Sequence, residues 1–348
     1  MTILTRKHWA AGAKWHHGAV KLADLIATAR VFAIPLHDEF RGITVREGVL
    51  LEGPAGWAEF APFRDYPDDA CVTWLRAAID TAEKPWPSPV RSFVEVNTTV
   101  AVVTPERAGE LVLASGCRTA KVKVGGFDGS VAGAVSNNSL ADDAARLAAV
   151  RNALGSGGRI RIDANAGWTV RQALTAIPVL DAAAGGLEYV EQPCASLQDM
   201  AEVRRRVQVP IAADESIRRA QDPMRVVLAG AADLAVVKVA PLGGVRRALE
   251  IAERTGLPIV VSSAVDTAVG LAAGLALAAA LPALDHACGL GTASLLQGDI
   301  SSDTFVPQAG QLPVPVRAPE PDRLAEFSAG AEVTAFWTAR LARVAALL

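Results

Sequence analysis

The feature that most constrains the fold of this chain is a regular alternation of short apolar segments with longer amphipathic ones. Strand-like runs lie at 94–100, 119–124, 159–163, 187–191, 209–213, 234–239, 258–262 and 285–289. Helical runs lie between them at 105–114, 139–153, 169–184, 196–207, 222–228, 244–255 and 266–280. This alternation predicts a parallel (β/α) barrel, whose strands are apolar because both faces are covered. A doubly wound open sheet also fits the alternation, but no glycine-rich phosphate loop follows an early strand.

The segments on either side of the repeat divide the chain further. Residues 31–90 hold short strand-like runs, then a helical stretch from Asp68 to Glu83 and a proline-rich boundary at 85–90. We therefore predict four regions: an extension at 1–22 that we expect to be disordered, an α+β capping domain at 23–92, a barrel at 93–298, and a C-terminal segment at 299–348 that packs back on the capping domain. The Gly-, Ser- and Asn-rich stretch 125–140 is interpreted as a surface loop, with a substrate-sensing lid as the alternative.

Composition excludes several classes of function. The 348 residues carry a net charge of −3, which gives no basis for nucleic-acid binding. No apolar run is long and uninterrupted enough to span a membrane, and the basic N-terminus lacks the apolar core of a signal peptide. The four cysteines are far apart, which indicates reduced, structural thiols. We expect a cytoplasmic protein that acts on a small molecule, and the sequence does not predict its oligomeric state.

Three carboxylates end successive apolar runs of the predicted barrel. They are Asp163, Glu191 and Asp214, separated by 28 and 23 residues, which is about one strand and one helix per step. In a parallel barrel all three would lie on the same rim, where they repel one another unless a cation neutralises them. Each alone also fits a surface carboxylate or a helix cap. Together they predict a site for a hard divalent cation, Mg²⁺ with Mn²⁺ as the alternative.

Two lysines accompany the carboxylates. Lys123 and Lys238 end predicted strands where a barrel interior favours Val or Ile, and Lys121 precedes Lys123 by two residues on the same strand face. A neighbouring cation favours the neutral amine, so Lys123 is the candidate general base. The alternative is that these lysines only form ion pairs with the carboxylates.

These segments, KVK, D-x-N, EQP, ADES and VVK in that order, resemble the enolase superfamily. The resemblance implies a modified (β/α)7β barrel with a small α+β capping domain, and proton abstraction beside a substrate carboxylate. It implies metal binding by Asp163, Glu191 and Asp214, with Lys123 as acid/base on the second strand and Lys238 as its partner on the sixth. Asn165 and Glu215 would support these groups.

Further stretches narrow the resemblance. The predicted seventh strand lacks the histidine of mandelate-racemase-like members, and the eighth lacks the D-x-D of dipeptide epimerases. FRGITVREG, GWAEFAPF, EYVEQPC, VVKVAPLGGV and VVSSAVDTAVGLAAG resemble the actinobacterial o-succinylbenzoate synthase family. This implies Mg²⁺-dependent syn-dehydration of 2-succinyl-6-hydroxy-2,4-cyclohexadiene-1-carboxylate in menaquinone biosynthesis, through a metal-stabilised enediolate. Two alternatives stay open: an N-acylamino acid racemase, alone or as a second activity, and an inactive barrel that serves as a binding scaffold.

The predicted substrate contacts follow from the same resemblance. They are Lys121, Asn165, Ser262, Ser263, Gly289 and Arg41. Ser262 and Ser263 end the seventh predicted strand, and we expect one of them, Ser262 rather than Ser263, to help hold the succinyl carboxylate, although a plain strand-end turn fits them equally well. Gly289 would let the substrate approach the backbone. Arg41 would either contact the substrate from the capping domain or pair with an acid.

Overall fold

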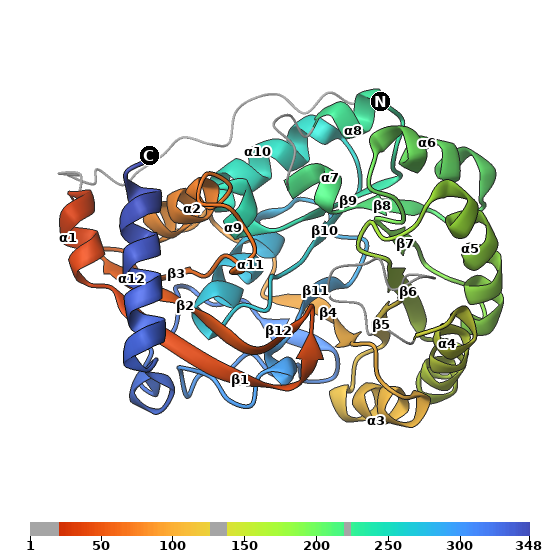
Figure 1. Cartoon of the computed structure of the whole chain (residues 1–348), viewed down its shortest axis with the longest axis horizontal. Helices are drawn as coiled ribbons and strands as arrows, with labels where there is room; N and C mark the ends of the chain where they lie inside the picture. The colour runs from red at the N-terminus through yellow and green to blue at the C-terminus, as the bar shows by residue number, and fades with distance from the viewer. Residues whose placement is uncertain (1–20, 126–137, 219–223) are drawn as a thin grey trace.

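The computed structural model describes residues 21–125, 138–218 and 224–348, and shows a barrel with a smaller antiparallel sheet beside it (Figure 1). Of residues 1–22, for which the sequence predicts disorder, only Lys21 and Leu22 are described. Leu22 is the first residue of α1 (Leu22–Ala27). Most of the predicted loop at 125–140 also lies outside the described residues.

Eight parallel strands form the barrel in chain order, so that each strand pairs with the next one along the chain. They are β4 (Phe93–Val100), β5 (Thr119–Lys123), β6 (Arg159–Asp163), β7 (Val190–Glu191), β8 (Ile211–Ala213), β9 (Leu234–Val237), β10 (Ile259–Val261) and β11 (Cys288–Gly291). β11 pairs with β4, and a parallel bridge between Ser262 and Gly289 links the end of β10 to β11. The predicted parallel barrel is confirmed, and the open-sheet alternative is wrong.

Helices cover the outside of the barrel (Figure 1). They are α3 (Pro105–Ser115), α4 (Leu140–Leu154), α5 (Val170–Ala184), α6 (Leu197–Arg206), α8 (Met224–Leu228), α10 (Val245–Thr255) and α11 (Ala268–Ala280). Two short helices, α7 (Glu215–Arg218) and α9 (Val239–Leu242), instead follow the C-terminal ends of β8 and β9. Local sequence fixes several starts: Ser139 with Asp142 and Thr169 with Gln172 form capping boxes at α4 and α5. Apolar side chains of these helices and of the strands form the large core.

The inside of the barrel has its own small apolar layer. Tyr189, Ala212, Leu234, Val236 and Val260 form it, one or two from each of β8, β9 and β10 and one from the residue before β7. Side chains two residues apart on a strand share a face. The charged residues that follow these positions, such as Glu191 after Tyr189 and Lys238 after Val236, therefore also point inward, one layer nearer the C-terminal rim.

The opposite end of the barrel is closed by a polar cluster. Arg161 donates to Glu188 Oε2 at 2.9 and 2.6 Å and to the carbonyl of Ala287 at 2.8 Å, and His286 Nδ1 lies 2.8 Å from Glu188 Oε1. The carbonyl of Ala287 is thus bonded to a side chain, and β11 begins at the next residue, Cys288, three residues after the predicted start at 285. His286 lies in this cluster, away from the C-terminal rim.

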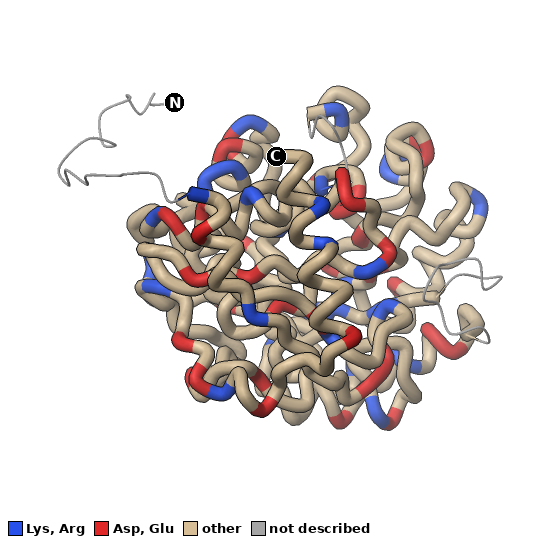
Figure 2. The backbone as a smooth tube through the Cα atoms, turned by 60° about the vertical axis from the view of Figure 1, so that its left-hand side comes forward, with Lys and Arg blue, Asp and Glu red and all other residues tan. Residues whose placement is uncertain are grey.

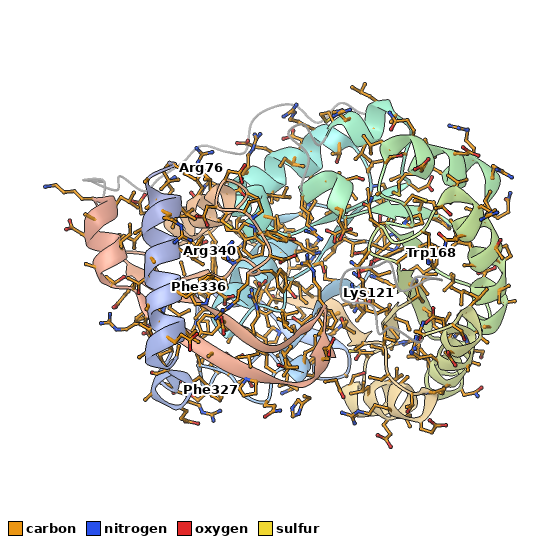
Figure 3. The ribbon with its side chains drawn as sticks, viewed as in Figure 1. Arg76, Lys121, Trp168, Phe327, Phe336 and Arg340 are labelled. Carbon is orange, nitrogen blue, oxygen red and sulfur yellow. The ribbon has the colours of Figure 1, made fainter. Side chains whose placement is uncertain are left out.

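The smaller sheet contains β1 (Arg30–Phe40), β2 (Ile43–Gly53) and β3 (Gly56–Phe60), all antiparallel, and packs with α2 (Val72–Glu83) and α12 (Ala331–Ala345). We call these five elements the cap. Trp337, Leu341 and Val344 of α12 are buried in its core, and Figure 3 shows Phe336 and Arg340 on the same helix. Between barrel and α12 lie η1 (Ala293–Leu295), η2 (Leu324–Phe327) and β12 (Gln311–Pro313), which pairs antiparallel with β4.

Charges of both signs are interspersed over the described chain (Figure 2). None of the helices within residues 21–125, 138–218 and 224–348 is long and apolar enough to cross a membrane. All four cysteines are buried and unpaired, and burial raises the pKa of the Cys194 and Cys288 thiols to about 12. They are therefore packed, unreactive thiols, in agreement with the structural role predicted for them.

Candidate active site

The C-terminal ends of the barrel strands open into a pocket that is covered by the cap. The barrel lines it with Thr99, Lys121, Lys123, Asn165, Arg218, Lys238, Pro241, Ser262, Ser263, Ala264, Val265, Gly289 and Thr292, and the cap and the segment after β3 supply Phe40, Arg41, Phe63, Tyr66 and Trp74. Both candidate catalytic lysines and all six predicted substrate contacts lie in this lining. The three carboxylates lie beneath it, and Figure 3 labels Lys121 among the strands.

Strand register brings the charged residues together. Lys123 pairs in register with Asp163, and Asp163 with Glu191, so these three side chains lie side by side on β5, β6 and β7. Asp214 directly follows β8 and is 1% exposed, as is Asp163, whereas Glu191 is 0% exposed. The spacing read from the sequence thus corresponds to neighbouring positions on one rim.

Gln192 fixes the position of Asp214. Its backbone has φ of 40°, and its Oε1 accepts from the backbone N–H groups of Asp214 at 3.0 Å and Ser216 at 3.1 Å. Its Nε2 donates to Ser216 Oγ at 2.8 Å. A left-handed non-glycine residue at a rim of this kind is a strained position that the surrounding bonds hold in place. The glutamine of the EQP segment therefore ties the tip of β7 to the tip of β8.

Each carboxylate is paired with a cation. Lys121 Nζ lies 2.6 Å from Glu191 Oε1 and 2.9 Å from Asp163 Oδ2. Lys123 Nζ lies 2.5 Å from the same Asp163 oxygen and 2.7 Å from Asn165 Oδ1. Lys238 Nζ lies 2.6 Å from Asp214 Oδ2.

These pairings shift the pKa values of the two lysines of β5 in opposite directions. Burial alone lowers the pKa of Lys121, but Asp163 and Glu191 outweigh it and raise that pKa well above its usual value. Burial also lowers the pKa of Lys123, the Lys121 cation lowers it further, and Asp163 offsets only part of this. Lys121 is therefore a permanent cation, whereas Lys123 is the lysine whose neutral form is favoured.

The carboxylates also differ from one another. Burial tends to raise the pKa of Asp163 and of Asp214, but the cations beside them lower both values below the usual range, Lys121 and Lys123 for Asp163 and Arg218 and Lys238 for Asp214. For Glu191 burial and the Asp163 charge both raise the pKa. Glu191 is thus the carboxylate whose charge is least compensated.

The donor set of the rim fits a divalent cation. Within the described part of the chain, no three acidic, histidine or cysteine side chains are already gathered around a common point, because lysines and Arg218 occupy the carboxylates. Glu191 Oε2 is nevertheless buried without a hydrogen-bond partner among the described residues. Three carboxylates on adjacent strand ends, one with an oxygen left over, are the hard oxygen ligands that Mg²⁺ or Mn²⁺ requires.

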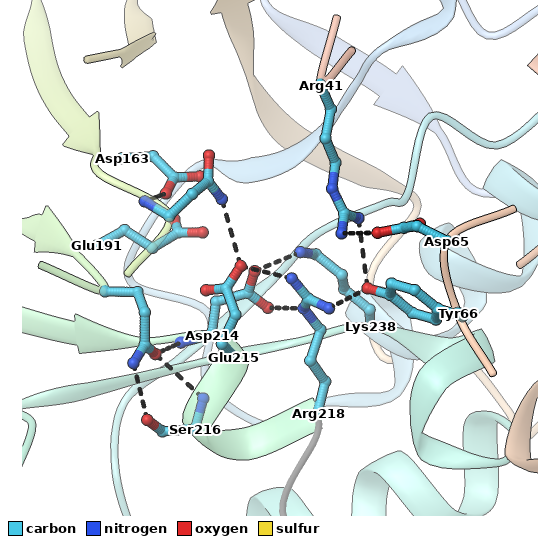
Figure 4. A network of polar contacts seen from close by, with 12 residues as sticks. Arg41, Asp65, Tyr66, Asp163, Glu191, Asp214, Glu215, Ser216, Arg218 and Lys238 are labelled. Carbon is cyan, nitrogen blue, oxygen red and sulfur yellow. Dashed lines mark hydrogen bonds and ion pairs between the residues drawn. The ribbon is translucent and has the colours of Figure 1, made fainter. Parts of the chain in front are cut away.

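Sequence reasoning missed a second network at the mouth of the pocket (Figure 4). Arg218 Nε donates to Asp214 Oδ1 at 2.9 Å and its NH1 to the hydroxyl of Tyr66, which also accepts from Arg41 NH1 at 3.3 Å. The spacing of Asp214 and Arg218, four residues apart at a helix start, was a usable signal for their pairing. No local sequence pattern predicts that Tyr66 contacts Arg218, because the two residues are 152 positions apart.

The fold and this rim together define a class of protein. Residues 31–82 match the family described as enolase N-terminal domain-like, and residues 104–319 match the family described as enolase C-terminal domain-like. The chain belongs to the enolase superfamily, whose enzymes generally use a divalent metal ion.

Similar proteins of known name show which family within the enolase superfamily the chain belongs to. The chain is 56% identical over 315 residues to the o-succinylbenzoate synthase of Thermobifida fusca (strain YX), covering 90% of this chain and 95% of that protein. It is 47% identical over 333 residues to the o-succinylbenzoate synthase of Mycolicibacterium smegmatis, covering 95% and 99%. Within the superfamily it therefore belongs to the o-succinylbenzoate synthase family.

Solved structures of lower identity share the fold. The L-Ala-D/L-Glu epimerase of Bacillus subtilis is 23% identical with a TM-score of 0.69, covering 84% of this chain and 96% of that one. The N-succinyl Arg/Lys racemase of Bacillus cereus is 19% identical with a TM-score of 0.69, covering 87% and 97%. These two similarities concern architecture alone.

Proposed function

We propose that this chain catalyses the Mg²⁺-dependent syn-dehydration of 2-succinyl-6-hydroxy-2,4-cyclohexadiene-1-carboxylate to 2-succinylbenzoate, a step of menaquinone biosynthesis. The chain is an enzyme, a carbon–oxygen lyase of the hydro-lyase type. The observation that carries the proposal is the rim itself: a lysine with a lowered pKa, which lines a pocket under the cap and lies beside three buried carboxylates. That set suits proton removal next to a carboxylate, which is the first step of this dehydration.

The pocket suits a small dianion. Besides the proposed base Lys123, four basic side chains line it, so cations surround the space in which a substrate with two carboxylates would bind: Lys121, Lys238, Arg218 and Arg41. On this proposal, the Ser262 and Ser263 hydroxyls and the backbone at Gly289, which also lines the pocket, hold the succinyl arm. Arg41 closes the mouth, where its guanidinium lies over the Phe63 ring at 4.3 Å.

Lys123 is proposed as the base. In its neutral form the Nζ lone pair takes the proton from the carbon that bears the ring carboxylate. The same Nζ, now an ammonium, delivers that proton to the 6-hydroxyl group on the same face. The C–O bond breaks, water leaves, and the ring becomes aromatic. Asn165 Oδ1, 2.7 Å from Nζ, accepts a hydrogen bond from Lys123 and orients it.

Lys238 is proposed to remain a cation across the pocket. Its Nζ is fixed by Asp214 Oδ2 at 2.6 Å, and its charge compensates the negative charge that develops on the ring. Lys121 keeps Asp163 and Glu191 oriented. The predicted ligands Asp163, Glu191 and Asp214 would hold the Mg²⁺ or Mn²⁺ ion, which when bound supplies Lewis-acid stabilisation of the substrate carboxylate.

A turnover assay tests the assignment of the substrate. Purified enzyme with Mg²⁺ is expected to convert the cyclohexadiene carboxylate to 2-succinylbenzoate, followed by the absorbance of the aromatic product. Substrate that is consumed no faster than in buffer would overturn the proposal.

One observation keeps a racemase of N-acylamino acids as a second candidate: lysines from two different strands, Lys123 and Lys238, both line the pocket. Racemisation needs both lysines to transfer protons at one carbon. Deuterium exchange distinguishes the two activities. Each enantiomer of an N-succinylamino acid is incubated in deuterium oxide with the Lys123→Ala variant and with the Lys238→Ala variant, and incorporation of deuterium at its α-carbon is measured. Exchange of one enantiomer by each variant supports racemisation, and no exchange by the wild type excludes it.

A further inference from the structure

A second buried charged cluster lies between the cap and the barrel, outside the catalytic rim. Arg46 comes from β2, Glu59 from β3 and Asp266 from the segment before α11. The side chains of Arg46 and Glu59 are 2% and 4% exposed. A small second pocket is lined by the two acids and shares Trp74 and Ser262 with the active-site pocket. The cluster therefore lies directly behind one wall of that pocket.

Glu59 caps a barrel helix from the other side of this interface. Its Oε2 accepts from the backbone N–H of Thr267 at 3.0 Å and from the Thr267 hydroxyl at 2.5 Å, at the start of α11. The first N–H groups of a helix have no partner within the helix, so an acceptor oxygen such as Glu59 Oε2 satisfies one of them there. Gly270 makes the approach feasible, because a Cβ at that position would lie 2.8 Å from Glu59 Oε2. The first turn of α11 is thus held by the cap.

Arg46 holds the segment that precedes α11. Its Nε donates to the carbonyl of Val265 at 2.9 Å, and its NH2 donates to the carbonyl of Ala61 in the cap. Val265 has φ of 61°, a left-handed conformation that is costly for a β-branched residue and persists only when its surroundings impose it. Val265 and Ala264 both line the active-site pocket. Arg46 therefore fixes a strained stretch of the pocket wall.

Charge balance in the cluster calls for one proton. Two carboxyl groups face one guanidinium, and Glu59 Oε1 is buried with no hydrogen-bond partner among the described residues. Burial and the neighbouring Asp266 raise the pKa of Glu59 to about 8, against the pull of Arg46 and the bonds from Thr267. The other charged groups that act on the cluster are Arg41 and Glu47 on Arg46, and Lys238 on Asp266.

We propose that Arg46 and Glu59 are positioning residues that fix the 262–267 wall of the active site to the cap, and that this attachment requires Glu59 to be neutral. Release of the 262–267 segment exposes Glu59 to water, where it ionises. The position of the cap over the pocket and the conformation of the 262–267 segment are then coupled, so that one does not change without the other. Neither residue touches the reacting atoms, so both act through Ser262, Ala264 and Val265.

Hydrogen–deuterium exchange of peptides that cover 262–270 tests this without any substrate. The attached state keeps a proton that the released state loses, so release should become about tenfold more favourable per pH unit, from roughly pH 5 up to the pKa of Glu59. Protection of this segment, corrected for intrinsic exchange, is expected to fall about 50-fold between about pH 6 and about pH 8 in the wild type, because Glu59 is half ionised in the attached state at pH 8. It should be nearly independent of pH in Glu59→Gln. The matched control is Glu52→Gln, on the exposed side of β2, which should behave as the wild type.

Two results would overturn the proposal: the same pH dependence in Glu59→Gln, or constant protection of this segment in the wild type. If Glu59→Gln does not fold, the wild-type profile alone still tests the proposal. Arg46→Lys supplies a kinetic readout, which rests on the proposed function. We expect KM to rise about tenfold with a smaller change in kcat, because Lys123 lies on a different strand. A fall in kcat at constant KM would contradict a positioning role.

Discussion

Replacing Lys121 with methionine removes the cation that two buried carboxylates share. Its Nζ lies 2.6 Å from Glu191 Oε1 and 2.9 Å from Asp163 Oδ2, and its side chain is 8% exposed. Methionine keeps the length and flexibility of the side chain, so the effect is mainly electrostatic. Breaking a buried ion pair by removing one partner costs roughly 3–5 kcal/mol. Lys121→Met should lower the free energy of unfolding by about that amount at neutral pH.

The pH dependence of this loss is more diagnostic than its size. Asp163 keeps Lys123 at 2.5 Å, so Glu191 is the group left without a cation. Burial and Asp163 already raise its pKa, and loss of Lys121 raises that pKa further. In the variant Glu191 is protonated when folded and ionised when unfolded, so stability falls as pH rises from the unfolded pKa to the folded one. One proton corresponds to about 1.4 kcal/mol per pH unit, so the variant should lose about 2.7 kcal/mol between pH 6 and pH 8. In the wild type the Glu191 pKa is raised only to about 7, so its own decline ends near that pH, and the loss caused by the substitution should be about 1.4 kcal/mol larger at pH 8 than at pH 6.

Urea unfolding in metal-free buffer at about pH 6 and about pH 8 measures this difference. The matched control is Lys84→Met, because Lys84 Nζ lies 2.9 Å from Asp80 but its side chain is 52% exposed. Exposed pairs contribute roughly 0–1 kcal/mol, so the control should change little at either pH. A Lys121→Met variant that loses no more stability than the control, or loses the same amount at both pH values, would refute the reasoning.

Three further predictions concern the closure of the barrel, the metal and Lys238. Gly289→Ala places a Cβ 2.5 Å from Ser262 Oγ and should destabilise the fold by roughly 1–3 kcal/mol in urea unfolding. Gly109→Ala, in α3 with its nearest neighbouring atom 4.0 Å away, should instead stabilise it by about 0.5–1 kcal/mol; equal effects of the two would contradict the close approach. Exhaustive chelation should abolish turnover and added Mg²⁺ restore it, and full activity in chelator would exclude the metal role. Lys238→Arg should retain measurable dehydration in a turnover assay, because a cation suffices there, and complete loss would argue for proton transfer by Lys238.

The sequence predicted the barrel well because its signal is repeated and local. Apolar runs of strand length, capped helices between them and a charge at the end of five successive strands, β5 to β9, are all visible within a few residues. Strand register explains why the predicted site residues are also neighbours in the structure. Lys123, Asp163 and Glu191 lie side by side because the parallel strands pair in chain order with their ends aligned.

What the sequence could not predict depends on contacts between distant segments. The attachment of Glu59 to Thr267 joins residues 208 positions apart, and the bond from Arg46 to Val265 joins residues 219 apart. The start of the eighth strand was misplaced for the same reason, since the bond from Arg161 to the carbonyl of Ala287 joins residues 126 positions apart. The short helices α7 and α9 were missed because four residues carry too little periodicity to read.

The central claim is that Lys123 moves the proton, and one comparison tests it most directly. Steady-state dehydration of the cyclohexadiene carboxylate is measured for the wild type and Lys123→Ala, with 2-succinylbenzoate affinity and thermal unfolding measured on the same samples. Loss of a general base that also returns the proton should lower kcat by at least about 10³-fold, while product affinity changes little and the variant remains folded. A folded Lys123→Ala variant with kcat within about tenfold of the wild type would contradict the account.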